Sequence, residues 1–200
     1  MTSTIKLLLT GIIFSITSWS IYAQGSNTSE PKTRFFIEID PATFVFKGYS
    51  AHLRIQPKFS DHMLIGVGIY AMDLPSVFVD FNKKNKDEGW DVRLNQGYGL
   101  FAEHHFGEVN KKWFAGAQTS IQEYRIKNDA VVGSQKFSNL LLMAYAGYTL
   151  KPFGNKLYFK PWAGLGFTTK VSGDNFLIEY EYDIAPMTVF ATLHVGYMFN

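Results

Sequence analysis

The stretch Met187-Thr-Val-Phe-Ala-Thr-Leu-His-Val-Gly-Tyr-Met-Phe199, which Asn200 follows, decides the fold of this chain. Every second residue from Met187 to Phe199 is apolar or aromatic, whereas most positions between them hold Thr, His or Gly. A period of two is what a β-strand imposes on its side chains, and this strand is longer than the usual strand of a soluble domain. We interpret the apolar face as one that meets lipid and the other face as one that meets a packed barrel interior.

Seven further segments with the same alternation precede this stretch, so the sequence predicts eight strands. Residues with turn chemistry separate them, and from the second strand onward the connections are alternately short and long. That alternation is typical of transmembrane β-barrels. Pro161 in the seventh strand predicts a bulge or a distortion, because proline lacks the N–H that a ladder needs. The expected strands span residues 34–40, 46–56, 62–72, 92–106, 113–127, 136–150, 157–171 and 187–199.

The composition excludes several classes of protein. The net charge of +2 and the pI near 8.6 are too mild to indicate nucleic-acid binding. Mean hydropathy is −0.04, and no internal stretch approaches the twenty apolar residues of a membrane helix, which excludes a helical bundle. The absence of Cys removes disulfides and cysteine-ligated metals. Charged residues make up 18%, below the quarter or so that is usual for soluble domains.

The N-terminus has the pattern of a processing signal. Lys6 supplies a basic region, residues 7–16 an apolar core, and Ala23 a cleavage point before Gln24. We therefore expect a signal peptide at 1–23, a flexible lead-in at 24–33 and the barrel at 34–200. An uncleaved anchor is the alternative.

Charged side chains fall on the faces opposite the apolar ones. An outward Arg or Lys at the middle of a bilayer costs about 2 to 4 kcal/mol, so we expect these charges inside the barrel. Most of them lie near strand ends on the short-turn side and are expected to share one level. Eight strands enclose just enough room for side chains, so we interpret the set as a paired plug that fills a polar lumen; a proton-transfer or anion site and a narrow ion path are the alternatives. The expected lumen network comprises Glu38, His52, Arg54, Arg93, Glu103, His105, Lys160 and His194.

The sequence offers no motif for a metal, a cofactor or a catalytic group, and we predict none of them. His104 and His105 are adjacent in a strand, so their imidazoles point to opposite faces and do not chelate one ion easily. No glycine-rich phosphate loop and no zinc-ligand spacing occurs. Exposed aromatics near the strand ends, among them Trp113 and Phe106 on one side and Trp90 and Tyr124 on the other, are expected to form interfacial belts.

The signal peptide, the eight amphipathic strands, the alternating loops and the aromatic near the C-terminus resemble the small outer-membrane β-barrels of Gram-negative bacteria. That broad group includes OmpX-like proteins and the lipid A deacylase. The pairs Gly97-Tyr98, Gly147-Tyr148 and Gly196-Tyr197 further resemble barrel proteins of Bacteroidetes. The resemblance implies an all-β, eight-stranded, antiparallel up-and-down transmembrane β-barrel in the bacterial outer membrane. It also implies that the barrel-assembly machinery recognises an aromatic of the last strand, here assigned to Tyr197 and Phe199.

The expected role is structural or one of surface interaction, by a monomer in contact with outer-membrane lipids. Loops 73–91 and 172–185 would meet an extracellular ligand. A lipid-modifying enzyme is one alternative, although the His-x-Ser pattern of the deacylase is absent and Ser60-Asp61-His62, which resembles residues of palmitoyl-transferring barrels, lies on the periplasmic side. A soluble, lipocalin-like periplasmic carrier is the other alternative.

Overall fold

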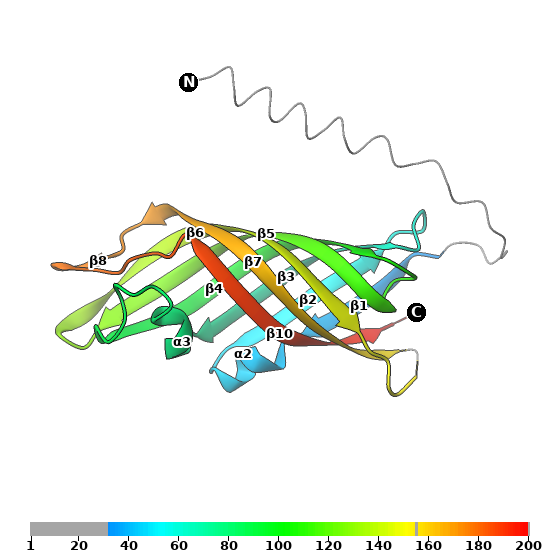
Figure 1. Cartoon of the computed structure of the whole chain (residues 1–200), viewed down its shortest axis with the longest axis horizontal. Coiled ribbons are helices and arrows are strands. Elements are labelled where there is room, and N and C mark those ends of the chain that lie inside the picture. The colour runs from blue at the N-terminus through cyan, green and yellow to red at the C-terminus, as the bar shows by residue number, and fades with distance from the viewer. Residues whose placement is uncertain (1–31, 155, 200) are drawn as a thin grey trace, which may run out of the picture. The chain divides into compact units, whose positions relative to one another are not determined.

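Eight antiparallel strands close into one barrel, which confirms the predicted architecture (Figure 1). The structure, a computed structural model, describes residues 32–154 and 156–199. The predicted signal peptide, almost all of the lead-in and Asn200 lie outside these residues. The order around the ring is β1-β10-β7-β6-β5-β4-β3-β2. The strands are β1 (Arg34–Ile39), β2 (Tyr49–Gln56), β3 (Met63–Asp73), β4 (Trp90–His105), β5 (Lys112–Asn128), β6 (Val131–Thr149), β7 (Leu157–Gly173) and β10 (Met187–Met198).

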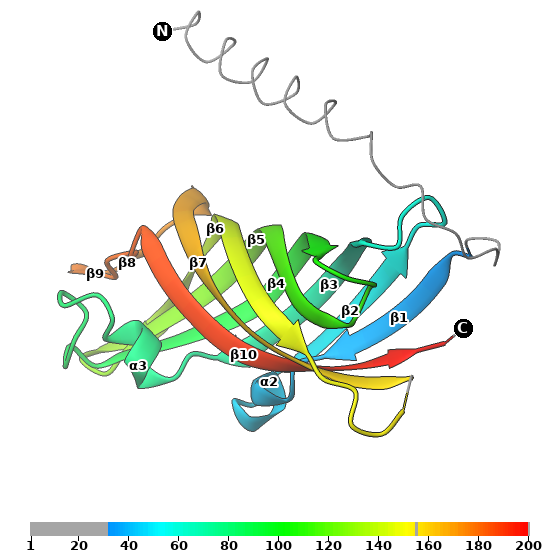
Figure 2. The same ribbon diagram turned by 45° about the vertical axis from the view of Figure 1, so that its right-hand side comes forward.

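The two ends of the barrel differ in their connections. The links after β2, β4 and β6 are short turns, and they lie at the same end as the start of β1 and the end of β10; we call this the short-turn end (Figures 1 and 2). The opposite, long-loop end carries α3 (Ser76–Val79) and the small hairpin of β8 (Phe176–Leu177) and β9 (Tyr180–Glu181). No helix among the described residues is long and apolar enough to cross a membrane.

The wall of the barrel is uneven in height. β1 has 6 residues and β2 has 8, whereas β6 has 19. The one-turn helix α2 (Pro41–Val45) links the two short strands, and Asp40 caps it by accepting a hydrogen bond from the Ala42 N–H at 2.9 Å. Proline at the first helical position is compatible with such a start. The helix therefore lies beside the part of the wall where β1 ends and β2 begins (Figure 2).

The hairpin of β5 and β6 is longer than the sequence predicted. Residues 128–135 were expected to form a loop, but β5 continues to Asn128 and β6 begins at Val131. Backbone pairing continues through these polar residues, with a register shift between Ile126 and Asn128. The prediction was wrong because backbone hydrogen bonds extend the ladder where the side chains show no apolar alternation.

Pro161 interrupts one ladder without changing its register. Pairing of β6 with β7 runs to Gly147 and Trp162 and resumes as a single bridge between Leu150 and Phe159. Phe159 exchanges both backbone hydrogen bonds with Leu150, so Pro161, two residues on, also turns its nitrogen toward β6. The expected distortion is thus a gap in the hydrogen bonding on one side of β7.

The outer surface of the barrel is apolar over most of its height. The outward positions of each strand, as the alternation predicted, carry exposed aliphatic and aromatic side chains. Charged residues at outward positions of the described barrel strands are confined to the long-loop side, where Asp73, Arg93, Arg125 and Lys136 lie. The apolar outward positions include Phe35, Leu53, Ile65, Val67, Ile69, Tyr98, Leu100, Trp113, Ile121, Leu142, Leu165, Phe167, Val189, Leu193 and Tyr197.

Bulky inward side chains occupy space left by glycines on neighbouring strands. A Cβ at Gly196 would lie 2.2 Å from the ring of Tyr158, and one at Gly68 would lie 2.1 Å from Nδ1 of His52. Neither approach is sterically possible for a residue with a side chain. The glycines of the wall thus allow large groups to fill the lumen.

Candidate functional site

Glu38 of β1 is the centre of a buried ionic cluster near the short-turn end. Its Oε1 accepts hydrogen bonds from Lys160 Nζ and from Tyr158 Oη, both at 2.9 Å. Its Oε2 accepts one from Arg54 Nε at 3.1 Å and lies 3.1 Å from His194 Nδ1. Four groups from β2, β7 and β10 therefore converge on a single carboxylate.

Glu103 of β4 supplies the second carboxylate. Lys160 Nζ donates to its Oε2 at 2.7 Å, and Tyr145 Oη donates to its Oε1 at 3.0 Å. Arg54 approaches the same carboxylate at 3.8 Å, and His105 Nε2 lies 3.3 Å from it without the alignment of a hydrogen bond. Two carboxylates thus face one ammonium and one guanidinium, which balances the charge of the cluster.

Aromatic and apolar groups seal the cluster. Lys160 Nζ lies 4.8 Å from the ring centre of Phe114, and the guanidinium of Arg54 lies 4.1 Å from that of Phe101. Cations over ring faces gain further attraction where water is excluded. Toward the short-turn end, Phe36, Leu64, Val109 and Tyr158 form an apolar group beneath the cluster.

The structure brings seven of the eight predicted lumen residues together. Glu38, Arg54, Glu103, Lys160 and His105 are in direct ionic range, and His194 joins them through Glu38. His52 stacks on His194 with ring centres 4.8 Å apart.

Arg93 does not belong to the cluster. β4 contains one extra residue between Leu94 and Gly97 relative to both β3 and β5, and this bulge reverses the face that the preceding residues of β4 occupy. Val92 and Leu94, predicted outward, are consequently buried inside. Arg93 lies on the outer surface, where it pairs with Asp73.

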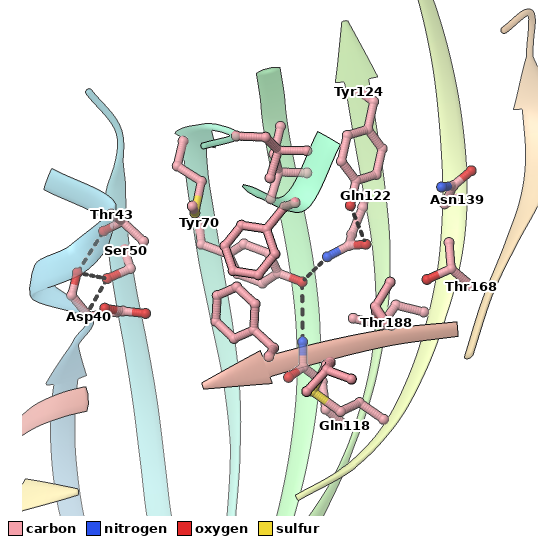
Figure 3. Close-up of a pocket in the computed structure, with 18 of the residues that line it drawn as sticks. Asp40, Thr43, Ser50, Tyr70, Gln118, Gln122, Tyr124, Asn139, Thr168 and Thr188 are labelled. Atoms are coloured by element: carbon pink, nitrogen blue, oxygen red, sulfur yellow. Dashed lines mark hydrogen bonds between the residues drawn. The ribbon is translucent and has the colours of Figure 1, made fainter. Parts of the chain in front are cut away.

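A cavity of about 170 Å³ lies between the ionic cluster and the long-loop end. His52, Phe101 and His194 line it on the side of the cluster, and Phe78 of α3 and Tyr182 line it on the side of the loops. The expectation of a filled lumen therefore describes only the short-turn half of the barrel. Figure 3 shows the polar residues that line the cavity.

The polar wall of this cavity is a network of side-chain amides and hydroxyls that are linked by hydrogen bonds. Tyr70 Oη donates to Ser120 Oγ at 2.9 Å and accepts from Gln122 Nε2 at 3.0 Å and from Gln118 Nε2 at 3.2 Å. Tyr124 donates to Gln122 Oε1 at 2.9 Å, so it faces the lumen, and its predicted place in an outer aromatic belt is wrong.

Asn139 does not take part in this series of hydrogen bonds. Its side chain is 2% exposed and borders the cavity, yet its Oδ1 has no hydrogen-bond partner among the described residues (Figure 3). A buried, unpaired amide oxygen costs about 1 to 3 kcal/mol, so its presence calls for an explanation. The alternation of the strands did place Gln118, Gln122 and Asn139 inward, but nothing in the sequence distinguished amides that line a cavity from amides that fill a core.

Asp183 joins the two longest loops across the long-loop end. Its carboxylate accepts hydrogen bonds from Asn82 Nδ2 at 2.8 Å and pairs with Lys84 Nζ at 2.5 Å, and its backbone N–H donates to Asn85 Oδ1 at 2.9 Å. The hydrogen bond from Lys84 lowers the pKa of Asp183 more than partial burial raises it. The loops that contain Asn82 and Asp183 therefore cover the cavity as one unit.

Other candidate groups are not arranged for catalysis. His62 Nδ1 lies 2.7 Å from the Gly107 carbonyl oxygen, and Ser60 Oγ accepts from backbone N–H groups at 3.2 Å, so Ser60 and His62 do not form a relay. His104 is exposed while His105 is buried, as the alternation predicted. Within residues 32–154 and 156–199, no group of three or more acidic or His side chains has the arrangement to hold a metal ion.

The residues assigned to assembly lie at the end of β10. Tyr197 and Phe199 are exposed on the outer surface, with ring centres 5.7 Å apart, and the Phe199 N–H donates to the Phe35 carbonyl at 3.0 Å. Their recognition by an assembly machinery remains a prediction.

The fold and the site together define a closed eight-stranded antiparallel β-barrel with an apolar exterior, an ionic plug and a small cavity. No family model and no curated protein matches the chain. Among solved structures, the N-terminal β-barrel domain of Pseudomonas aeruginosa OprF is similar, with 14% identity and a TM-score of 0.42, over 86% of this chain and 100% of that one. A likeness this distant assigns no function.

Proposed function

We propose that this chain is a monomeric outer-membrane β-barrel of a Gram-negative bacterium, with a structural or surface-interaction role. The main support for this proposal is the outer surface of the barrel. Aliphatic and aromatic side chains cover this surface, while the paired charges lie inside the barrel. Lipid favours that arrangement, and a carrier dissolved in water would have the reverse.

A row of charged residues supports the position of the membrane boundary. Asp73 of β3, Arg93 of β4, Arg125 of β5 and Lys136 of β6 are direct cross-strand neighbours at one level. This row lies on the long-loop side of the apolar surface. The three cations of this row, Arg93, Arg125 and Lys136, suit the phosphates of lipid headgroups. Lipids of the outer leaflet are therefore the partners that we propose for the row.

The ionic plug argues against an open pore. Glu38, Arg54, Glu103 and Lys160 are nearly inaccessible to solvent, so water and ions have no wide path past them. The proposed contacts with the outside therefore use the loops 73–91 and 172–185. Tyr197 and Phe199 are proposed to guide insertion by the barrel-assembly machinery.

Fractionation of cells that express the full-length chain tests this proposal. The protein should sediment with the outer membrane, resist carbonate extraction and migrate faster on gels before heating than after. Trypsin added to intact cells should cut near Lys83 and Lys86 but leave the turns of the short-turn end intact. Recovery in the soluble periplasmic fraction would overturn the proposal in favour of a water-soluble carrier.

A further inference from the structure

We propose that the cavity binds a small, uncharged aromatic molecule that carries a hydrogen-bond donor, of the class of indole or a phenol. This inference goes beyond the proposed function, and it does not depend on the membrane in which the barrel resides. It rests on the volume of the cavity, the character of its walls and the unpaired acceptors that border it.

The volume of the cavity suits a ligand with a single ring or with two fused rings. An apolar cavity of about 150 Å³ is large enough to bind benzene, and this cavity measures about 170 Å³. A drug-sized ligand would need several hundred Å³. The ligand is therefore small.

Aromatic side chains form much of the wall. Trp162 and Phe190 lie with ring centres 5.7 Å apart, and Phe78 of α3 stacks on Phe190 at 5.4 Å. Phe101 and Phe137 complete this lining. Ring faces and edges of this kind favour a planar aromatic guest.

Two amide oxygens at the cavity lack a donor among the described residues. Gln122 is satisfied on both sides, because its Nε2 donates to Tyr70 and its Oε1 accepts from Tyr124. Gln118 donates from Nε2 but accepts no hydrogen bond from the described residues, and Asn139 Oδ1 is unpaired. A ligand with an N–H or O–H group supplies the missing donor.

The charged groups nearby already have hydrogen-bond or ionic partners. Asp40 accepts hydrogen bonds from Thr192 Oγ1 at 2.8 and 2.9 Å and from the Ala42 N–H. His194 Nδ1 lies 3.1 Å from Glu38 Oε2, so it is engaged with the ionic cluster. An anionic guest would find no free cation among the described residues of the wall, and a cationic guest would have to displace the donors of Asp40, which disfavours both.

Fluorine NMR of 5-fluoroindole with the full-length barrel in detergent micelles tests the proposal. We expect a protein-dependent resonance, absent from micelles alone, that indole displaces. Indene has the same shape as indole but lacks the N–H, so it should compete about three to ten times less well.

Two variants assign the resonance to the cavity. Asn139→Leu removes one of the two free acceptors at similar size and should reduce the preference for indole over indene. Asn95→Leu removes an amide that bonds to exposed Glu123 instead, and it should preserve the preference. Ala185→Trp inserts a ring into the space and should abolish the resonance. The proposal is overturned if wild type gives no resonance beyond micelles, or if Ala185→Trp or Asn139→Leu behaves like wild type; circular dichroism verifies that each variant is folded.

Discussion

The carboxylate of Glu38 is fully buried and contacts both cations of the plug. Glu38→Gln removes the negative charge but keeps the size, and it leaves Arg54 and Lys160 with a single carboxylate between them. Removing one partner of a buried pair costs about 3 to 5 kcal/mol. We expect the free energy of unfolding in lipid vesicles, followed by tryptophan fluorescence in urea, to fall by that amount.

Glu108→Gln is the matched control for this substitution. Glu108 pairs with Lys111 in the turn before β5, and both side chains are more than half exposed. An exposed pair contributes about 0 to 1 kcal/mol, so this variant should unfold nearly like wild type. Equal losses in the two variants would show that the plug does not stabilise the barrel.

The alternation of the sequence was sufficient to place most of the cluster, because a period of two leaves little freedom about which face a residue occupies. It failed at Arg93, since the bulge in β4 depends on backbone geometry that side-chain patterns do not encode. It also missed the role of Asn139. Whether an inward amide meets a partner or a cavity depends on the residues opposite, which only the register determines.

The loops that cover the cavity depend on the contacts of Asp183. Asp183→Ala removes the acceptor of Asn82 and the partner of Lys84 while the backbone contacts of residue 183 remain. We expect trypsin to cleave at Lys83 and Lys86 about two to five times faster in this variant. Glu181→Ala in the same loop is the control, and an equal acceleration in both would contradict the role given to Asp183.

Acid should loosen the same loops. The pKa of Asp183 is lower in the folded chain than its unfolded value of about 3.9, so its ion pair is intact above that value and is lost as pH falls through the folded pKa. We expect pepsin cleavage of these loops, normalised to Asp183→Asn at each pH, to rise below about pH 4. A constant ratio from pH 5 to pH 2 would exclude Asp183 as the responsible group.

The gap at Pro161 allows a gain in stability. Pro161→Val restores an N–H that faces β6, and one added hydrogen bond contributes about 0.5 to 1.5 kcal/mol. We expect a higher free energy of unfolding and slow hydrogen exchange at residue 161. Pro57→Val, in the turn after β2, should bring no comparable gain, and fast exchange at residue 161 would show that the ladder stays open.

Strand number and order of the barrel followed from the sequence, but strand ends did not. β5 extends to Asn128 and β6 begins at Val131 because their backbones remain hydrogen-bonded there. The polar side chains of these residues give no signal for or against such pairing. The helices α2 and α3 are too short to leave a periodic signal.

The whole barrel offers a direct test of the surface that meets lipid. Leu100 on the outer face of β4 is 60% exposed, and Val132 near the tip of the β5–β6 hairpin is 99% exposed. Leu100→Arg should lower the free energy of unfolding in vesicles by about 2 to 4 kcal/mol, while Val132→Arg should change it by at most about 1 kcal/mol. Indifference to both substitutions would mean that neither position touches hydrocarbon.

The glycines of the barrel wall and the bulky side chains that fill the lumen depend on each other. Tyr158 occupies the room that Gly196 leaves, and His52 occupies the room beside Gly68. Related sequences should therefore covary at these positions: a chain that gains a methyl group at 196 will have lost bulk at 158. Selection acting on such couples, rather than on single sites, would maintain the shape of the interior even where overall similarity has faded.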